Sequence, residues 1–237
     1  MAKIQREIPV SGNHLLARLP PADQRRLAPH LEPVPLAFSQ ILYPPGGPVD
    51  FVYFPEHGVV SVVAVMADKR TIEVGLCGRE GAVGAAAVLG DPTSPFRVQV
   101  QVAGDGMRIG IDAFRHASKA GGAMHRLLAR YHAAFLTQTA QSVACNGLHS
   151  VRQRCCRWLL MTHDRMGADV FDLTHEFLGM MLGVRRASVS EVLNPLQADG
   201  LIGYERGRFT VHDRSRLEDQ SCECHAFVQS QFDRLLP

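Results

Sequence analysis

The 237-residue chain contains no long hydrophobic run. The longest apolar stretch, residues 59–67, is nine residues long and is interrupted by Ser61, whereas a membrane-crossing helix needs about 20 apolar residues. Residues 1–12 lack the apolar core that a secretory signal requires. We therefore expect a cytoplasmic protein that makes no membrane contact and whose six cysteines are reduced thiols.

Lysine is nearly missing, and neither sign of charge dominates. The net charge is +2, and the 25 basic residues comprise 22 arginines and 3 lysines. This charge is too small to indicate nucleic-acid binding by itself. Residues 146–237 contain 11 arginines and no lysine against 12 acidic residues, a net charge of −1. Any basic surface in that half must therefore be local.

Motifs of catalysis are also missing. The chain shows no Ser-His-Asp order, no phosphate-binding loop, no paired catalytic carboxylates and no clustered His-x-His of the kind that a cupin-type enzyme needs. The closest group of metal-ligand residues is Cys222, Cys224 and His225, whose spacing matches no standard zinc motif. We predict packed thiols, no metal, no cofactor and no enzyme activity, with a cupin-like metalloenzyme as the less favoured alternative.

Short runs rich in β-branched and aromatic residues occupy the chain from about residue 33 to residue 112. Such runs predict strands, and turn signals rich in glycine and proline separate them. Residues 97–102, RVQVQV, alternate polar and apolar side chains, which is typical of a half-buried strand. We therefore predict an antiparallel, jelly-roll-like β-roll. Its expected strands include residues 51–55, 59–67, 71–76 and 96–102.

A long helix is predicted after the roll, over about residues 122–146, where glycine and proline disappear. Apolar side chains recur there at spacings of four, three and four residues, which is a helical seam. The seam either packs on the chain's own domain or pairs with a second copy in a homodimer, and spacing alone leaves both open. The candidate dimer residues are Met124, Leu128, Tyr131, Phe135 and Ser142.

Residues 172–211 predict two short helices followed by a hairpin. Thr174 is a suitable N-cap for the first helix, and Gly183 lies where a tight turn needs positive φ. A second helix begins near Arg185, three or four residues later, which is the helix-turn-helix arrangement. A hairpin with its turn at Arg206 and Gly207 follows as a wing. A closing helix is expected over residues 215–236.

The second helix presents a polar face that fits the major groove of DNA. Arginine there can pair with guanine, while serine and the wing arginines can reach phosphates or base edges. The alternative is an ordinary solvated surface, but helix, glycine turn, helix and wing in this order favour DNA. The predicted DNA-binding residues are Thr174, Arg185, Arg186, Ser188, Ser190, Glu191, Asn194, Arg206 and Arg208.

These motifs resemble the Crp–Fnr family of bacterial transcription regulators. The resemblance is strongest in residues 173–202, where Arg186, Ser188 and Val189 match the family's Arg-x-[Ser/Thr]-Val pattern. It implies an α+β fold with a β-roll (1–120), a long dimerisation helix (121–147) and a winged helix-turn-helix (148–237). It further implies a homodimer that binds a pseudo-palindromic operator in double-stranded DNA, with RNA polymerase as a candidate partner.

The resemblance also identifies where an effector site would lie. Nucleotide-binding members carry Gly-Glu and then Arg-Ser or Arg-Thr, whereas this chain has Gly84-Ala85 and Arg97-Val98. Gln138, on the long helix, completes the candidate effector set. Loss of the glutamate predicts a degenerate sensor without cyclic-nucleotide control. The alternatives are a nucleotide held at Arg97 or another small effector. The absence of cysteine before Cys77 argues against the iron–sulfur centre of oxygen-sensing members.

Overall fold

The computed structural model describes residues 12–237. Most of residues 1–12, on which the prediction of no secretory signal depends, therefore lies outside the described residues. Antiparallel sheets form the N-terminal roll: a three-stranded sheet in the order β1-β9-β4, a four-stranded sheet in the order β2-β8-β5-β6, and a small β3-β7 pair. The predicted antiparallel roll is confirmed. The roll strands are β1 (Leu31–Leu36), β2 (Ile41–Tyr43), β3 (Gly47–Pro48), β4 (Phe51–Pro55), β5 (Val59–Val65), β6 (Thr71–Cys77), β7 (Thr93–Ser94), β8 (Arg97–Val102) and β9 (Gly104–Gly110).

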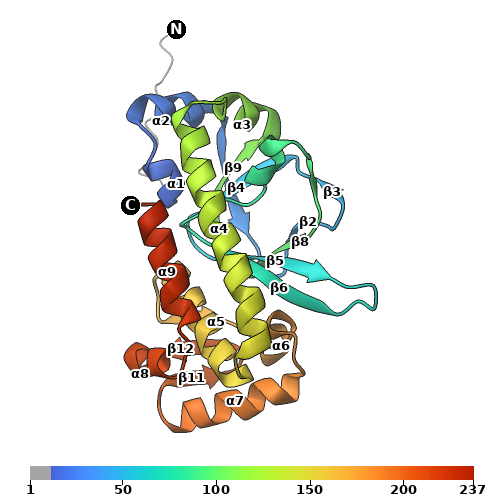
Figure 1. Ribbon diagram of the computed structural model, residues 1–237, viewed down its shortest axis with the longest axis vertical. Coiled ribbons are helices and arrows are strands. Elements are labelled where there is room, and N and C mark those ends of the chain that lie inside the picture. The colour runs from blue at the N-terminus through green and yellow to red at the C-terminus, as the bar shows by residue number, and fades with distance from the viewer. Residues whose placement is uncertain (1–11) are drawn as a thin grey trace.

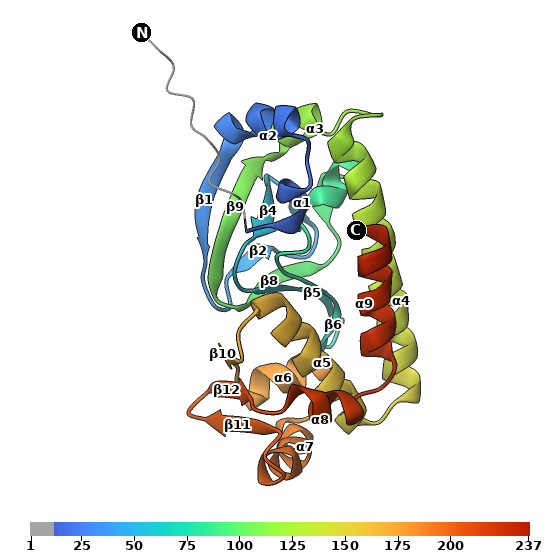
Figure 2. The same cartoon turned by 90° about the vertical axis from the view of Figure 1, so that its left-hand side faces the viewer.

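Helices flank the roll and form most of the C-terminal half. The long helix α4 runs along the molecule from the roll to the C-terminal domain, and α9 packs along it (Figures 1 and 2). Among the described residues no helix is both long and apolar enough to cross a bilayer. The helices are α1 (His14–Ala17), α2 (Pro21–Leu27), α3 (Ile111–Ala117), α4 (Ala123–Leu148), α5 (Val151–Met166), α6 (His175–Leu182), α7 (Arg186–Ala198), α8 (Arg214–Asp219) and α9 (Cys224–Leu235), with 3-10 turns η1 (Ala28–His30) and η2 (Ala85–Leu89).

The strand β8 is buried on both faces, so the prediction of a half-buried strand is wrong. Val98, Val100 and Val102 face one side of the sheet, yet Gln99 and Gln101 are buried as well. Gln101 is fully buried, and its amide lies 3.5 Å from Thr162 Oγ1 on α5. The polar side of this strand therefore meets the C-terminal domain rather than water.

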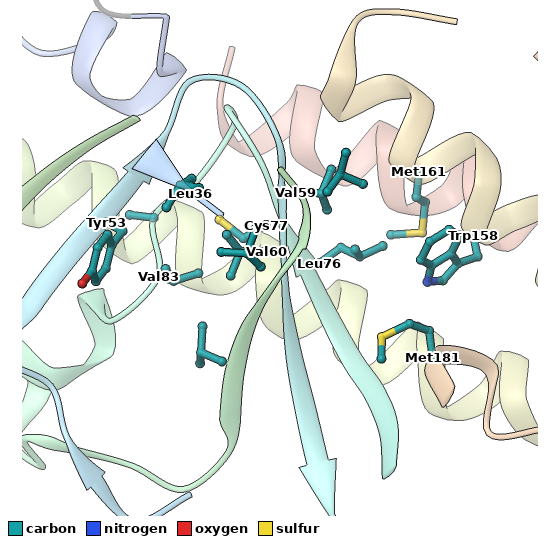
Figure 3. Packing of buried hydrophobic residues seen from close by; sticks show 14 of the residues in the cluster. Leu36, Tyr53, Val59, Val60, Leu76, Cys77, Val83, Trp158, Met161 and Met181 are labelled. Atoms are coloured by element: carbon teal, nitrogen blue, oxygen red, sulfur yellow. The ribbon is translucent and has the colours of Figure 1, made fainter. Parts of the chain in front are cut away.

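The hydrophobic core continues from the roll into the C-terminal domain. Leu76 of β6 points towards Trp158 and Met161 of α5, with Met181 of α6 nearby (Figure 3). The fully buried Trp158 carries the largest side chain of this junction. Burial of an aromatic or aliphatic side chain of this size contributes about 1.5–3 kcal/mol. The two halves are therefore joined by a packed interface and not only by the chain.

The segment after the wing forms two helices, α8 and α9, and the prediction of one closing helix over 215–236 is wrong in this respect. Between them the chain turns so that Cys222 reaches the end of α4, where its Sγ lies 3.5 Å from Sγ of Cys145. Leu217, Cys224 and Val228 are buried as expected for an inward face.

Candidate DNA-binding face and its link to the roll

The first two helices of the predicted motif are α6 and α7. Thr174 caps α6, because its Oγ1 accepts a hydrogen bond from the Phe177 backbone at 3.1 Å. Gly183 ends α6 with φ of 66°, and Val184 N then donates back to Gly179 O at 2.9 Å. A Cβ at Gly179 would lie 3.0 Å from Val184 O, so glycine permits this tight return. The predicted cap and turn are confirmed.

The N-terminal turn of α7 is open to solvent. Arg185 is the N-cap residue, and Arg186 opens the helix; both are exposed. Val189, Leu193 and Leu196 of the same helix are buried, so α7 is anchored by one face only. Of the remaining predicted DNA-binding residues on α7, Glu191 and Asn194 are exposed, whereas Ser188 and Ser190 are partly buried.

Ser190 does not point outward as predicted. Its Oγ lies 3.0 Å from Nδ1 of His175 on α6 and also reaches the Arg186 carbonyl at 3.4 Å. The hydroxyl thus connects the two helices and is not free for a phosphate. Thr174 is exposed, but its hydroxyl serves as the α6 cap described above.

The wing has the predicted turn. Arg206 and Gly207 have φ of 51° and 85° and join β11 (Ile202–Glu205) to β12 (Arg208–Val211), which also pairs with β10 (Val170–Asp172). The side chains of Arg206 and Arg208 are 92% and 72% exposed. Their nearest carboxylate partners are 3.8 and 3.9 Å away, and such exposed pairs contribute little. Both guanidinium groups can therefore turn to another anion.

The sequence interpretation missed His175 as the residue that joins helix, helix and wing. Its ring centroid lies 4.2 Å from that of Tyr204 on β11, and its Nδ1 contacts Ser190 on α7. Burial, followed by the positive charge of Arg186, lowers the pKa of His175. A neutral imidazole thus holds α7 and the wing in one orientation. Only the fold shows this role, because the three residues are far apart in sequence.

Comparisons with known proteins agree with this geometry. The profile of the Crp-like helix-turn-helix domain matches residues 153–220. The structure also resembles the regulator FixK2 of Bradyrhizobium japonicum (TM-score 0.69, 17% identity, 81% of this chain and 98% of that chain). It is similar to TTHB099, a transcriptional regulator of the CRP family from Thermus thermophilus (TM-score 0.66, 23% identity, 79% and 96%). No curated protein matches the chain.

Together the domain and the fold confirm the predicted resemblance to Crp–Fnr family transcription regulators. The structural similarity covers the roll, the long helix and the winged domain. A third similar structure is that of CLP of Xanthomonas campestris, described as a c-di-GMP responsive global regulator (TM-score 0.64, 18% identity, 81% of this chain and 98% of that chain).

The long helix α4 turns its larger apolar side chains towards the chain's own roll. Of the predicted dimer residues, all but the partly buried Phe135 are buried within the single chain. A Cβ at Gly81 would lie 2.5 Å from the Tyr131 ring, and one at Gly75 would lie 2.5 Å from the Phe135 ring. The predicted seam therefore packs within the chain, against the roll at Tyr131 and Phe135 and against Arg157 of α5 at Ser142, and is not available to a second copy. That seam comprises Met124, Leu128, Tyr131, Phe135 and Ser142.

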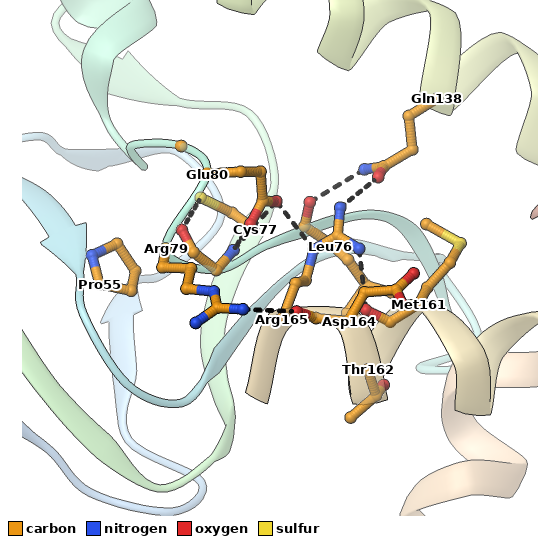
Figure 4. A network of polar contacts seen from close by, with 12 residues as sticks. Pro55, Leu76, Cys77, Arg79, Glu80, Gln138, Met161, Thr162, Asp164 and Arg165 are labelled. Atoms are coloured by element: carbon orange, nitrogen blue, oxygen red, sulfur yellow. Dashed lines mark hydrogen bonds and ion pairs between the residues drawn. The ribbon is translucent and has the colours of Figure 1, made fainter. Parts of the chain in front are cut away.

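Gln138 belongs to a polar network between the domains and not to an effector pocket. Its Nε2 donates to Leu76 O of the roll at 2.9 Å, and its Oε1 accepts from Arg165 at 2.8 Å. Arg165, on α5, also donates to the Glu80 carboxylate of the roll at 2.8 Å (Figure 4). The Arg165 side chain is 7% exposed and the Glu80 side chain is 19% exposed, so a largely buried ion pair joins the roll to α5. The hydrogen bond from Arg165 to Gln138 links both to the long helix.

The other predicted effector residues lie in or beside a small apolar cavity of about 230 Å³ in the roll. Gly84, Ala85 and Val98 line it, together with Tyr43 and Phe135 among others. Gly84 has φ of 84°, and a Cβ there would overlap the Tyr43 hydroxyl.

Arg97 is not among the residues that line this cavity, although both of its neighbours in sequence are. The Nε of Arg97 is buried without a hydrogen-bond partner among the described residues. No carboxylate or guanidinium lines the cavity, so the structure brings together only part of the predicted effector set.

Proposed function

We propose that this DNA-binding regulator acts as a homodimer on a two-fold, pseudo-palindromic operator, with one α7 helix in each half-site. The observation that supports the proposal is the open N-terminal turn of α7, where Arg185 and Arg186 are exposed, as are the wing arginines Arg206 and Arg208. An α-helix fits the major groove, and an arginine there pairs bidentately with guanine O6 and N7. Contact with RNA polymerase and a cytoplasmic location stay predictions from the sequence.

The arginines of the DNA-binding half fall into a buried group and an exposed group, so exposed arginines can gather locally although the net charge of this half is −1. Arg154, Arg157 and Arg165 are buried on α5 and bond to groups inside the protein. The arginines at the start of α7 and in the wing are exposed at the end of the molecule away from α2 and α3 (Figure 2). A local basic face thus exists without a basic domain, and local charge is what phosphate contacts need.

A different face of α4 supports the homodimer. Small and apolar residues recur there at spacings of four and three, the heptad pattern of paired helices, and all of them are exposed in the single chain. Leu136 and Val143 are 68% and 70% exposed, unusually high for such side chains. A second copy of the helix would cover this stripe, which we call the outer stripe. It comprises Ala129, Ala133, Leu136, Ala140, Val143 and Gly147.

Replacing Arg186 with alanine is expected to weaken binding to the selected operator by about 1–3 kcal/mol and to relax base preference at one position of each half-site. The reason is loss of a bidentate contact to a base while the helix stays anchored by its buried face. Operators would first be selected from a random DNA pool with the purified protein. Binding of parent and variant would then be measured by fluorescence anisotropy on the operator and on single-base variants.

The matched control for this experiment is Arg26→Ala. Arg26 is 75% exposed on α2, pairs only with Asp23 at 3.4 Å and lies at the other end of the molecule. Its loss should leave operator affinity unchanged. An Arg186→Ala protein that keeps the parent's affinity and base preference on every DNA would show that Arg186 is not a reading residue.

The roll is proposed to be a degenerate sensor that does not bind cyclic nucleotides. The cavity has apolar walls, and no carboxylate faces it to hold ribose hydroxyls. The unpartnered Nε of Arg97 favours the alternative, a nucleotide phosphate held at that residue. We expect titration calorimetry with cyclic AMP, cyclic GMP and c-di-GMP to give no saturable heat. Saturable heat that Arg97→Ala abolishes would establish the alternative.

A further inference from the structure

Four metal-ligand side chains meet where α4 ends and α9 begins. Cys145 and His149 come from the end of α4, and Cys222 and Cys224 come from the turn before α9 and its first residue. The ligand atoms of all four lie within 4.8 Å of one another. The three cysteines are 0–5% exposed and the His149 side chain is 17% exposed, so the group is closed to solvent except at the histidine.

Two of the six distances between ligand atoms are close to the edges of a coordination tetrahedron, and all six are within 4.8 Å. With Zn–S of about 2.3 Å and Zn–N of about 2.0–2.1 Å, two sulfur ligands lie about 3.8 Å apart and a sulfur–nitrogen pair about 3.6 Å apart. Cys145 Sγ lies 3.5 Å from Cys222 Sγ, and Cys224 Sγ lies 3.5 Å from Nδ1 of His149. The side chains need only small adjustments to surround one ion.

Neighbouring polar side chains hydrogen-bond to the four ligand residues, as residues behind the ligands of a metal site do. His149 turns Nδ1 to the sulfurs, while its Nε2 lies 3.4 Å from the Glu223 carboxylate. A carboxylate on the far nitrogen fixes the tautomer that leaves Nδ1 free to bind a metal. The amide of Gln141 donates to Cys224 Sγ at 3.0 Å.

Ordinary packing does not account for these thiols. The other three cysteines, Cys77, Cys155 and Cys156, are part of the main hydrophobic core with leucines, valines and aromatics. Cys145, Cys222 and Cys224 form a separate buried cluster that contains no other hydrophobic side chain. Three sulfurs and one imidazole nitrogen are the donor set of closed structural zinc sites.

We propose that Cys145, His149, Cys222 and Cys224 bind one Zn²⁺ ion that fastens the two ends of the DNA-binding domain to each other. The chain enters this domain after His149 and leaves it at Cys222, so the ion closes the intervening segment into a loop. His225, which the sequence grouped with the cysteines, instead pairs with Asp164 at 2.8 Å. The sequence predicted no metal because Cys222, Cys224 and His225 match no standard zinc spacing, and the other two ligands lie more than 70 residues earlier in the chain.

The test is metal analysis of the full chain, produced in zinc-supplemented medium and purified without chelator. About one zinc per chain is expected by plasma mass spectrometry, and Cys222→Ala with Cys224→Ala should lower it at least fivefold. The matched control, Cys155→Ala, removes a buried thiol outside the cluster and should keep the zinc. Cobalt exchange should give the ligand-field bands of tetrahedral Co²⁺ with thiolate ligands.

A measurement on the unaltered chain keeps the proposal falsifiable if the double variant does not fold. Titration with a mercurial reagent should release the zinc as the cluster thiols react. Zinc below about one fifth per chain together with no tetrahedral cobalt spectrum would overturn the proposal. Iron with inorganic sulfide, or a Cys145–Cys222 disulfide in the purified chain, would overturn it equally. None of these outcomes depends on whether the protein binds an operator.

Discussion

Replacing Leu136 with glutamate is expected to make the chain monomeric and to weaken its binding to a two-fold operator by about 100-fold or more. Leu136 lies in the middle of the outer stripe and is 68% exposed in the single chain. Pairing of two copies would bury it, so a carboxylate there would have to lose its hydration without a partner. Each monomer would then contact one half-site alone and lose the gain from linked binding.

The measurements are sedimentation velocity for mass and fluorescence anisotropy for DNA affinity, both over a range of protein concentrations. Ile41→Glu is the matched control, because Ile41 is a 52% exposed apolar residue on β2, away from α4. It should leave mass and affinity unchanged. A Leu136→Glu chain that stays dimeric and binds its operator like the parent would place the dimer interface elsewhere. A parent chain that is monomeric at every concentration would show that the proposed homodimer does not form.

The long helix shows what the sequence can and cannot specify. Its length and start followed from the missing glycine and proline, but it has apolar side chains on two faces. The predicted face contains Tyr131 and Phe135, the larger side chains, and these pack against the chain's own roll. The outer stripe is built around alanines, Leu136 and Val143. Spacing alone could not assign either face, because both have helical periodicity.

The winged domain was predictable because its signals are local. A cap at Thr174, a left-handed glycine at Gly183 and the turn at Arg206 each depend on a few neighbouring residues. The His175–Ser190 contact and the four-ligand cluster depend on which helices pack together. The periodicity of a single helix carries no such information, so Ser190 was placed outward and Cys145 was not connected with Cys222.

The same limit applies to the junction between the roll and the DNA-binding domain. Gln138 was predicted to face an effector but bonds Arg165 and the Leu76 carbonyl. A change in the roll that moved β6 would pull on α5 through these bonds and through Glu80. The junction is therefore the physical route by which the two domains can influence each other, whatever effector acts.

A second polar chain crosses this junction and contains a carboxyl group that is neutral at mildly acid pH. Glu73 Oε2 lies 2.6 Å from the Ser61 hydroxyl, which also bonds Oε1 of Gln101, whose amide approaches Thr162 on α5. One hydroxyl hydrogen cannot serve both acceptors, so the chain is completed when protonated Glu73 donates to Ser61. Loss of hydration raises the pKa of Glu73 to about 7, against the opposing effects of Ser61, Arg157 and Arg165.

This carboxyl group should make the protein less stable as pH rises. Between about pH 4.5 and pH 7 the folded chain retains a proton on Glu73 that the unfolded chain releases, so the free energy of unfolding falls with pH. One pKa unit corresponds to about 1.4 kcal/mol, so the full loss above pH 7 is about 3 kcal/mol. Glu73→Gln, which is neutral at every pH, should match the parent at pH 4.5 and exceed its stability by about 2–3 kcal/mol at pH 8.

Urea unfolding at four pH values between 4.5 and 8 measures this effect as the difference between parent and variant, which cancels the titration of all other groups. The exposed Glu176 on α6 provides the matched control. Glu176→Gln should change the free energy of unfolding by less than about 0.5 kcal/mol. A constant difference between parent and Glu73→Gln across the range would show that Glu73 has the same pKa in the folded and unfolded chain. A difference that grows with pH would show that Glu73 holds a proton in the folded chain that the unfolded chain releases.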